Sequence, residues 1–311
     1  MEIFTTMITP FTKEGEVDYK TAEKYVDFYF DSGIDGIFAV CQSSEIFYLS
    51  LEERVKLNRI VYERAKELEE KSGRPFTVVS SGHVSDTLED QAQELCEIYA
   101  SGTDALILIT NRLDPRNEGD DVFIKNAEKL LAMLPKEARL GFYECPYPYK
   151  RLLTPRILDW CISTGRFDYM KDTCCDAKTI AERCNQLRGS GFKLLNANCQ
   201  TLLESMRCGA DGYCGIMCNY HPRLYAWLGK NYLCERAEEV QAFIGTFGFT
   251  EVGIPYPLTA KYHMNLVGIP TENVARAKKG ELLTDYARSC TEQMKRAADA
   301  LEKSLGIGEA Q

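Results

Sequence analysis

The stretch FTVVSSGHVSDTLEDQAQELCEIYASGTDALILIT, residues 76–110, decides the fold because it has the pattern of one strand–helix–strand unit. Its two ends, Phe76–Ser81 and Ala105–Thr110, are short apolar runs rich in residues that favour strands. Between them, after a cap candidate at Ser85 and before a stop at Gly102, apolar residues recur at helical spacing: Leu88, Ala92, Leu95, Cys96 and Tyr99. Two strands joined through a helix predict a parallel sheet.

The same alternation continues on both sides of this unit. Counting its two strands, the chain has eight such runs, and the other six are Ile3–Thr9, Gly36–Gln42, Arg139–Cys145, Phe167–Asp172, Phe192–Ala197 and Gly212–Ile216. Eight strand–helix units within about 225 residues fit a closed barrel better than an open doubly wound sheet. No G-x-G-x-x-G or phosphate-loop motif is present. We therefore predict an α/β fold, a (β/α)8 TIM barrel.

The strand signals stop near Leu224. From there the chain has amphipathic helical patterns that are broken at Pro255, Pro257 and Pro270. We expect a catalytic barrel domain over residues 1–223 and a helical C-terminal extension over residues 224–311 that is not an independent domain.

Composition narrows the class of protein. The chain has 37 basic and 46 acidic side chains and a formal net charge of −9, which argues against a nucleic-acid partner. No stretch approaches the roughly eighteen apolar residues of a membrane span, and the N-terminus lacks a signal-peptide pattern. The 13 cysteines lack the regular spacing of a secreted disulfide framework. We therefore expect a cytoplasmic protein with reduced thiols and no membrane partner.

Lys171 is the first candidate for chemistry. Active sites of TIM barrels lie at the carboxyl ends of the strands, and Lys171 is near the end of the sixth run. Burial favours the neutral form of an amine, which is the form that attacks a ketone to give a Schiff base. The alternative is a structural lysine that pairs with the neighbouring Asp172.

Tyr143 is near the end of the fifth run, one strand before Lys171. Adjacent strands lie about 5 Å apart, so its phenol could reach a substrate bound to Lys171 and move a proton. The alternative is an ordinary core aromatic. Glu144 follows and should face the opposite side of a regular strand, which favours a structural carboxylate.

The loop after the second run, Cys41–Glu45, has hydroxyl and backbone N–H groups that could hold a carboxylate. A metal site is disfavoured, because the chain has only 3 histidines and because Cys174–Cys175 and the pair Cys214 and Cys218 lack zinc-ligand spacing.

Several positions together resemble the dihydrodipicolinate synthase and N-acetylneuraminate lyase family, a group of Schiff-base-forming class I pyruvate lyases. Tyr143 and Pro146 match its Y-N-x-P motif, and Lys171-Asp172 matches the end of G-x-K-[DE], with Tyr169 in place of the usual glycine. Further matches are Thr9-Pro10-Phe11 with Gly15 and Val17-Asp18, the spacing from Glu45 to Leu49-Ser50, and Gly209-Ala210-Asp211-Gly212 with Asn219 and Pro222.

This resemblance implies catalytic roles and an assembly. Lys171 would form the Schiff base and Tyr143 would relay protons, with no metal and no cofactor apart from the covalent imine on Lys171. Ser43 and Ser44 would bind the substrate carboxylate, and Gln42 replaces a threonine of the proton relay. The family is usually homotetrameric.

Departures from the family pattern bear on the substrate. Thr110–Leu113 replaces the aromatic pair that supplies an interface tyrosine, and Pro148 replaces the arginine that holds the semialdehyde carboxylate in dihydrodipicolinate synthase. Both argue against the lysine-pathway synthase. In the seventh strand Asn196-Ala197-Asn198-Cys199 replaces the common S-G-D-D, which exchanges carboxylates for neutral groups. The amides of Asn196 and Asn198 can donate as well as accept hydrogen bonds, which suits a polyhydroxylated or neutral tail.

Two further residues complete the predicted substrate site. Thr173 is where lyase members contact substrate, and Cys214 lies in the eighth run.

Three hypotheses for function follow. The first is an aldolase that cleaves or forms the C3–C4 bond of a 4-hydroxy-2-oxo acid, with pyruvate and an aldehyde as small-molecule partners. The second is a dehydratase of a 2-keto-3-deoxy sugar acid that uses the same imine, with Glu144 as a candidate acid–base group. The third is a catalytically silent barrel that binds a 2-oxo acid. A metal-dependent aldolase is a further option, which the low histidine content disfavours.

Overall fold

The computed structural model describes residues 1–250 and 255–308, and its centre is a closed barrel of eight parallel strands. Each strand pairs with its neighbours in the chain, and β8 pairs with β1. The predicted TIM barrel is therefore confirmed, and each predicted run overlaps one strand. The strands are β1 (Glu2–Thr6), β2 (Gly36–Phe38), β3 (Thr77–Ser80), β4 (Ala105–Ile109), β5 (Leu140–Tyr143), β6 (Phe167–Asp172), β7 (Lys193–Asn196) and β8 (Gly212–Gly215).

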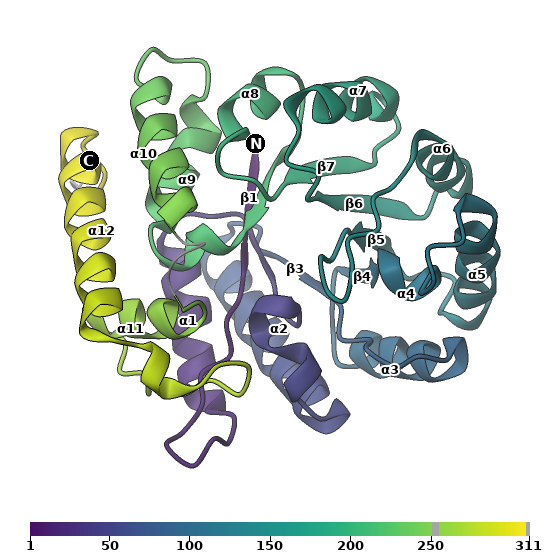
Figure 1. Ribbon diagram of the computed structural model, residues 1–311, viewed down its shortest axis with the longest axis horizontal. Helices are drawn as coiled ribbons and strands as arrows, with labels where there is room; N and C mark the ends of the chain where they lie inside the picture. Colours follow the sequence, from purple (N-terminus) through teal and green to yellow (C-terminus); the bar gives the residue numbers. More distant parts are fainter. Residues whose placement is uncertain (251–254, 309–311) are drawn as a thin grey trace.

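Helices surround the barrel and extend it on one side (Figure 1). Those as far as α9 are α1 (Tyr19–Asp31), α2 (Leu51–Ser72), α3 (Leu88–Ala100), α4 (Thr110–Leu113), α5 (Asp120–Met133), α6 (Pro155–Thr164), α7 (Ala177–Leu187), α8 (Leu202–Arg207) and α9 (Pro222–Asn231). The C-terminal helices are α10 (Ala237–Thr250), α11 (Leu258–Leu266) and α12 (Asp285–Ser304). Short 3-10 helices are η1 (Gln42–Ser44), η2 (Ile46–Tyr48), η3 (Ile216–Asn219) and η5 (Gly280–Leu282).

The unit formed by β3, α3 and β4 follows its sequence pattern with one correction at the helix start. Ala92 and Leu95 are buried, as the helical spacing predicts. The N-cap is Thr87 and not Ser85, because the Thr87 hydroxyl accepts a hydrogen bond from the Asp90 backbone N–H at 3.1 Å. The Ser85 hydroxyl donates instead to the Glu94 carboxylate at 3.0 Å.

Strand ends are the other difference from the sequence pattern. The second run extends to Gln42, but β2 ends at Phe38 and η1 begins at Gln42. The chain therefore turns over the carboxyl end of the barrel soon after β2, and this turn carries Gln42 and Ser43 toward the barrel axis.

The interior of the barrel has one unusual pair of residues. Tyr169, which replaces the glycine of the family motif, lies opposite Gly141 in the register of β5 and β6. The Tyr169 ring packs against Phe4, with centroids 5.6 Å apart. A Cβ on Gly141 would lie 2.6 Å from the Tyr169 carbonyl oxygen, so only glycine fits at that position beside the tyrosine.

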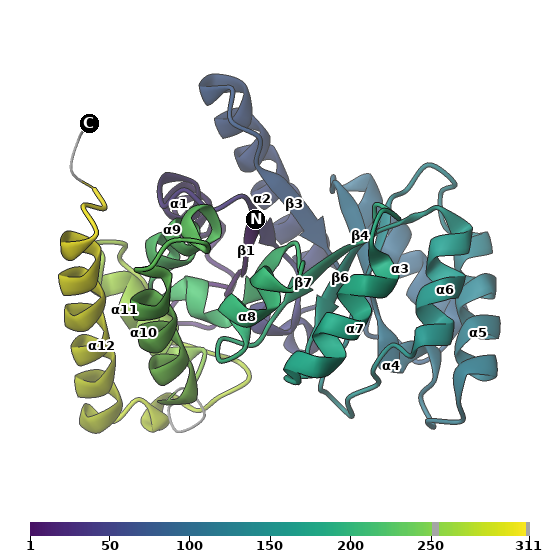
Figure 2. The same cartoon turned by 90° about the horizontal axis from the view of Figure 1, so that it is seen from above.

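The C-terminal helices form a group beside the barrel. α10, α11 and α12 lie together on one side, opposite α3, α5 and α6 (Figure 1, Figure 2). The proposed domain division after residue 223 falls within the first turn of α9 and stays a prediction. Within residues 1–250 and 255–308, no helix combines the length and apolar character needed to cross a membrane.

Two buried histidines lie where these helices meet. The His221 ring stacks on Tyr225 and meets Phe243 edge-on, with centroids 5.6 and 5.2 Å away. Neither ring nitrogen of His221 has a hydrogen-bond partner among the described residues, and the same is true of Nδ1 of His263. Burial lowers the pKa of each histidine to about 3. Both side chains are therefore neutral at physiological pH.

These histidines should make the folded state sensitive to acid. Below pH about 6.5 these histidines bind protons in the unfolded chain but stay neutral in the folded chain. The free energy of unfolding therefore falls as the pH falls below this value and does not depend on these histidines above it. We expect a loss of roughly 1 kcal/mol per histidine between pH 7.5 and 5.5 in urea titrations. His221→Phe removes one of these histidines, so the loss of unfolding free energy between pH 7.5 and 5.5 should be smaller by roughly 1 kcal/mol. An unchanged pH dependence in this variant would contradict the assignment.

Candidate active site

A cavity of about 550 Å³ opens at the carboxyl ends of the barrel strands. Loops after β2, β5, β6, β7 and β8 line it, together with two segments of the C-terminal region. The lining residues are Gln42, Ser43, Glu45, Phe47, Tyr48, Tyr143, Pro146, Tyr147, Lys150, Lys171, Thr173, Cys175, Ala197, Asn198, Gly215, Ile216, Tyr256, Pro257, Ala277 and Lys278. This is the end of the barrel where TIM-barrel active sites lie.

Lys171 and Tyr143 lie side by side at the base of this cavity. They are directly opposite each other in the register of β5 and β6. The Lys171 ammonium lies 4.3 Å from the centre of the Tyr143 ring and 5.6 Å from that of Phe38. Lys171 makes no ion pair with Asp172, whose carboxylate binds Arg183. The predicted pair is thus brought together, with exposed fractions of 8% for Lys171 and 5% for Tyr143.

The phenol of Tyr143 has a defined partner. Its hydroxyl donates to Oε1 of Gln42 at 2.9 Å, and the thiol of Cys145 donates to the same oxygen at 3.6 Å. Burial, followed by the neighbouring Cys145, Cys41 and Cys214, raises the pKa of Tyr143 well above its usual value. The phenol is therefore protonated in the free protein.

The two serines of the loop after β2 have different positions. Ser43 lines the cavity, and its hydroxyl donates to Oγ1 of Thr6 at 3.0 Å. Ser44 is fully buried outside the cavity lining, where its hydroxyl donates to the carbonyl oxygens of Met7, at 2.7 Å, and of Ala39. The assignment of Ser44 to substrate binding is therefore corrected, because its hydroxyl holds the loop to the barrel.

The two asparagines predicted to bind substrate also have different positions. Asn198 lines the cavity. Asn196 does not, because it lies opposite Asp172 in the register of β6 and β7 and faces away from the barrel interior. Its amide donates to the hydroxyls of Thr201 and Ser205, both at 3.0 Å.

The last two predicted substrate contacts differ in the same way. Thr173 lines the cavity, although its hydroxyl donates to the Glu144 carbonyl at 2.7 Å. Cys214 is buried and is not part of the lining, which Gly215 and Ile216 form at this strand end. Burial raises the pKa of the Cys214 thiol to about 12. Asn196 and Cys214 are thus corrected as substrate contacts.

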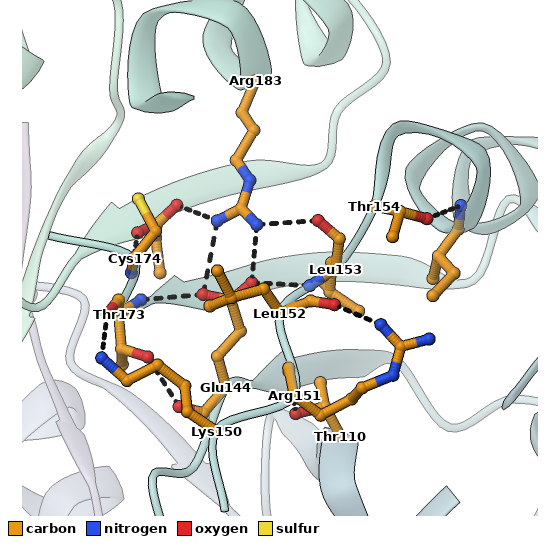
Figure 3. A network of polar contacts seen from close by, with 12 residues as sticks. Thr110, Glu144, Lys150, Arg151, Leu152, Leu153, Thr154, Thr173, Cys174 and Arg183 are labelled. Carbon is orange, nitrogen blue, oxygen red and sulfur yellow. Dashed lines mark hydrogen bonds and ion pairs between the residues drawn. The ribbon is translucent and has the colours of Figure 1, made fainter. Parts of the chain in front are cut away.

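Glu144 belongs to a buried ion group on the outer side of the barrel (Figure 3). Nη2 of Arg183, from α7, lies 2.8 Å from Oε1 of Glu144, and Nη1 binds Asp172. The Glu144 carboxylate also accepts backbone N–H groups of Leu153 at 2.8 Å and Thr173 at 2.9 Å. Glu144 does not line the cavity. The structure therefore supports the structural interpretation of this carboxylate and not a role as an acid–base group.

Glu45 joins the barrel to the C-terminal region. Its carboxylate lies 2.7 Å from Nζ of Lys261 in α11, and both side chains are buried. The same carboxylate accepts the backbone N–H groups of Arg276 and Ala277, each at 2.7 Å. Arg276 in turn pairs with Glu53 of α2 at 2.7 Å. These bonds place Ala277 and Lys278 at the cavity.

Sequence reasoning missed several lining residues, notably Lys150, Tyr256 and Lys278. Lys150 lies only seven positions after Tyr143, so its place after a strand end was a usable signal. Tyr256 and Lys278 come from the helical extension, for which local periodicity gives no contact information.

Metal ligation is not favoured by the side chains present. Within the parts of the chain that the structure describes, no group of three or more His, Cys, Asp or Glu side chains could hold a metal ion. None of the 13 cysteines forms a disulfide within the described residues.

The buried ion group gives a prediction for stability. Arg183→Met leaves Glu144 and Asp172 buried without their cation, so the free energy of unfolding should fall by about 3–5 kcal/mol. The matched control is Arg156→Met, which breaks an exposed ion pair with Asp121 and should cost at most about 1 kcal/mol. Denaturant titrations measure both, and equal small losses would contradict the assigned role of Arg183.

Comparison with known proteins agrees with this architecture. Residues 1–68 match the model of the dihydrodipicolinate synthetase family. The 4-hydroxy-tetrahydrodipicolinate synthase of Pseudomonas aeruginosa is 26% identical over 222 residues, which are 70% of each chain. That of Staphylococcus haemolyticus is 23% identical over 218 residues, 70% of this chain and 69% of the relative.

Solved structures share the fold over nearly the whole chain. Dihydrodipicolinate synthase of Bacillus anthracis has a TM-score of 0.80 at 18% identity, covering 95% of this chain and 97% of its own. CdNal from Clostridium difficile, solved with mannosamine, has a TM-score of 0.81 at 17% identity, covering 95% and 98%. The family-model match and the curated relatives support the resemblance of this chain to the dihydrodipicolinate synthase and N-acetylneuraminate lyase family, and the solved structures share its barrel fold.

Proposed function

We propose that the protein is a Schiff-base-forming lyase that cleaves or forms the C3–C4 bond of a 4-hydroxy-2-oxo acid. The observation that carries the proposal is the position of the Lys171 ammonium, 4.3 Å from the centre of the Tyr143 ring at the base of the cavity. A lysine nucleophile beside a phenol provides the two groups that imine chemistry needs. The products of cleavage are pyruvate and an aldehyde.

The first step is formation of the imine on Lys171. The neutral amine attacks the C2 carbonyl carbon of the 2-oxo acid, and a proton moves from nitrogen to oxygen to give a carbinolamine. Tyr143 then donates its proton to the C2 hydroxyl, which leaves as water, so that a protonated imine and a phenolate remain. In this proposal the hydroxyl of Ser43, which lines the same cavity, binds the substrate carboxylate.

The second step uses the phenolate as a base. It takes the proton from the C4 hydroxyl while the C3–C4 bond breaks and its electrons move to the imine nitrogen. An aldehyde leaves, pyruvate stays bound as an enamine, and Tyr143 is again protonated. The high pKa of Tyr143 makes its phenolate a strong base, and the adjacent positive imine stabilises it.

Gln42 confines this proton to the site. An amide oxygen accepts hydrogen bonds but carries no proton to pass on, so Oε1 of Gln42 can orient the Tyr143 hydroxyl without relaying its proton to solvent. The threonine that Gln42 replaces in the family motif could relay a proton. The proton that Tyr143 gives to the leaving water is therefore recovered from the substrate itself.

The other hypotheses are less well supported. The dehydratase hypothesis uses Glu144 as its acid–base group. The Glu144 carboxylate binds Arg183 and lies outside the cavity lining. A silent 2-oxo-acid binder has no need for a phenol beside the lysine. Absence of a separate cofactor, cytoplasmic location and a homotetramer stay predictions.

Turnover with pyruvate and a panel of aldehydes tests the proposal. The wild-type protein should form 4-hydroxy-2-oxo acids, and Tyr143→Phe should lower kcat by about 10²–10⁴-fold because general acid–base catalysis is lost. Tyr169→Phe is the matched control, since this tyrosine lies in β6 but outside the cavity lining, and its kcat should stay within about twofold. A wild-type protein that condenses no aldehyde and exchanges no methyl protons of pyruvate with D2O would favour the silent binder.

A further inference from the structure

The charge of the cavity is opposite to that of the whole chain. The chain has a net charge of −9, whereas the cavity lining contains three lysines and a single carboxylate, that of Glu45. Glu45 is already balanced by Lys261 and by two backbone N–H groups. The cavity therefore has two cations, Lys150 and Lys278, beyond the lysine proposed to form the imine.

Lys150 is held at the cavity wall by hydrogen bonds that link it through Thr173 to Glu144 (Figure 3). Its Nζ donates to the Thr173 carbonyl at 2.7 Å, and the Thr173 N–H is fixed by Glu144 at 2.9 Å. Among the described residues, no carboxylate lies within 4.0 Å of the Lys150 ammonium. Two of its three N–H donors thus remain for a bound molecule.

Lys278 comes from the C-terminal region, between α11 and α12, and also lines the cavity. The backbone just before it is fixed, because Arg276 and Ala277 both donate N–H groups to Glu45. The Lys278 side chain is exposed and, within the described part of the chain, has no ion-pair partner. A fixed backbone that carries an unpaired ammonium group is suited to bind an anion from solution.

We infer that the substrate carries a second anionic group, a carboxylate or a phosphate, at the end remote from the imine, and that Lys150 and Lys278 are the specificity-determining residues that bind it. This inference rests on the proposed function. It replaces the neutral tail expected from the sequence, because of the two asparagines predicted to suit such a tail only Asn198 lines the cavity.

Pairs of aldehydes that differ in charge test the inference in condensation with pyruvate. One pair is succinic semialdehyde and butanal, and the other is glyceraldehyde 3-phosphate and glyceraldehyde. For the wild-type protein, kcat/KM should be at least about tenfold higher for the anionic member of one pair. The advantage should shrink as the salt concentration rises. The pair with the larger advantage distinguishes a carboxylate from a phosphate.

Variants show whether the two lysines cause this preference. Lys150→Gln and Lys278→Gln should each raise KM for the anionic aldehyde about five- to tenfold, with less than about twofold change for the neutral one. Lys150→Arg keeps the charge and should keep the preference. Lys279→Gln is the matched control, because Lys279 is exposed next to Lys278 but is not part of the cavity lining.

The outcomes separate the two proposals. If pyruvate condenses with neutral aldehydes as well as with anionic ones, or if both lysine variants affect both members of a pair equally, the inference is overturned and the proposed function stands. If the wild-type protein condenses no aldehyde and exchanges no methyl protons of pyruvate with D2O, both are overturned.

Discussion

The parallel register between β5 and β6 is the constraint on which the site depends. It sets Tyr143 opposite Lys171, and because side chains alternate along a strand, both face the barrel interior while Glu144 and Asp172 face outward. The outward pair binds Arg183 and fixes the loop that bears Thr173. One register thus gives a buried lysine beside a phenol on one face and, on the other, the ion group that supports the adjoining loops.

The mouth of the cavity depends on a second contact, between Glu45 and Lys261. Glu45 lies in the left-handed backbone region, with φ of 62°, directly after η1. Its carboxylate binds the α11 lysine and the backbone of residues 276–277. The loop with Gln42 and Ser43 and the C-terminal segment with Lys278 are therefore fixed by one buried charge.

The sequence was most informative where the signal is local. Eight apolar runs predicted all eight strands, and the place of Lys171 and Tyr143 at strand ends, with the family motifs, predicted that they lie together. Ser44, Asn196 and Cys214 lie outside the cavity lining, because a motif position does not tell which residues of a strand end or loop reach the lining. Lys278 was missed because it reaches the cavity through Glu45, which is 233 positions away in the sequence.

Reductive trapping of the imine tests the central claim most directly. The protein is incubated with pyruvate, reduced with borohydride, and digested so that the modified lysine can be located by mass spectrometry. The account predicts one reduced pyruvyl adduct, on Lys171, and none on Lys150 or Lys278, which line the same cavity. An adduct on another lysine, or none with pyruvate and with several other 2-oxo acids, would contradict it.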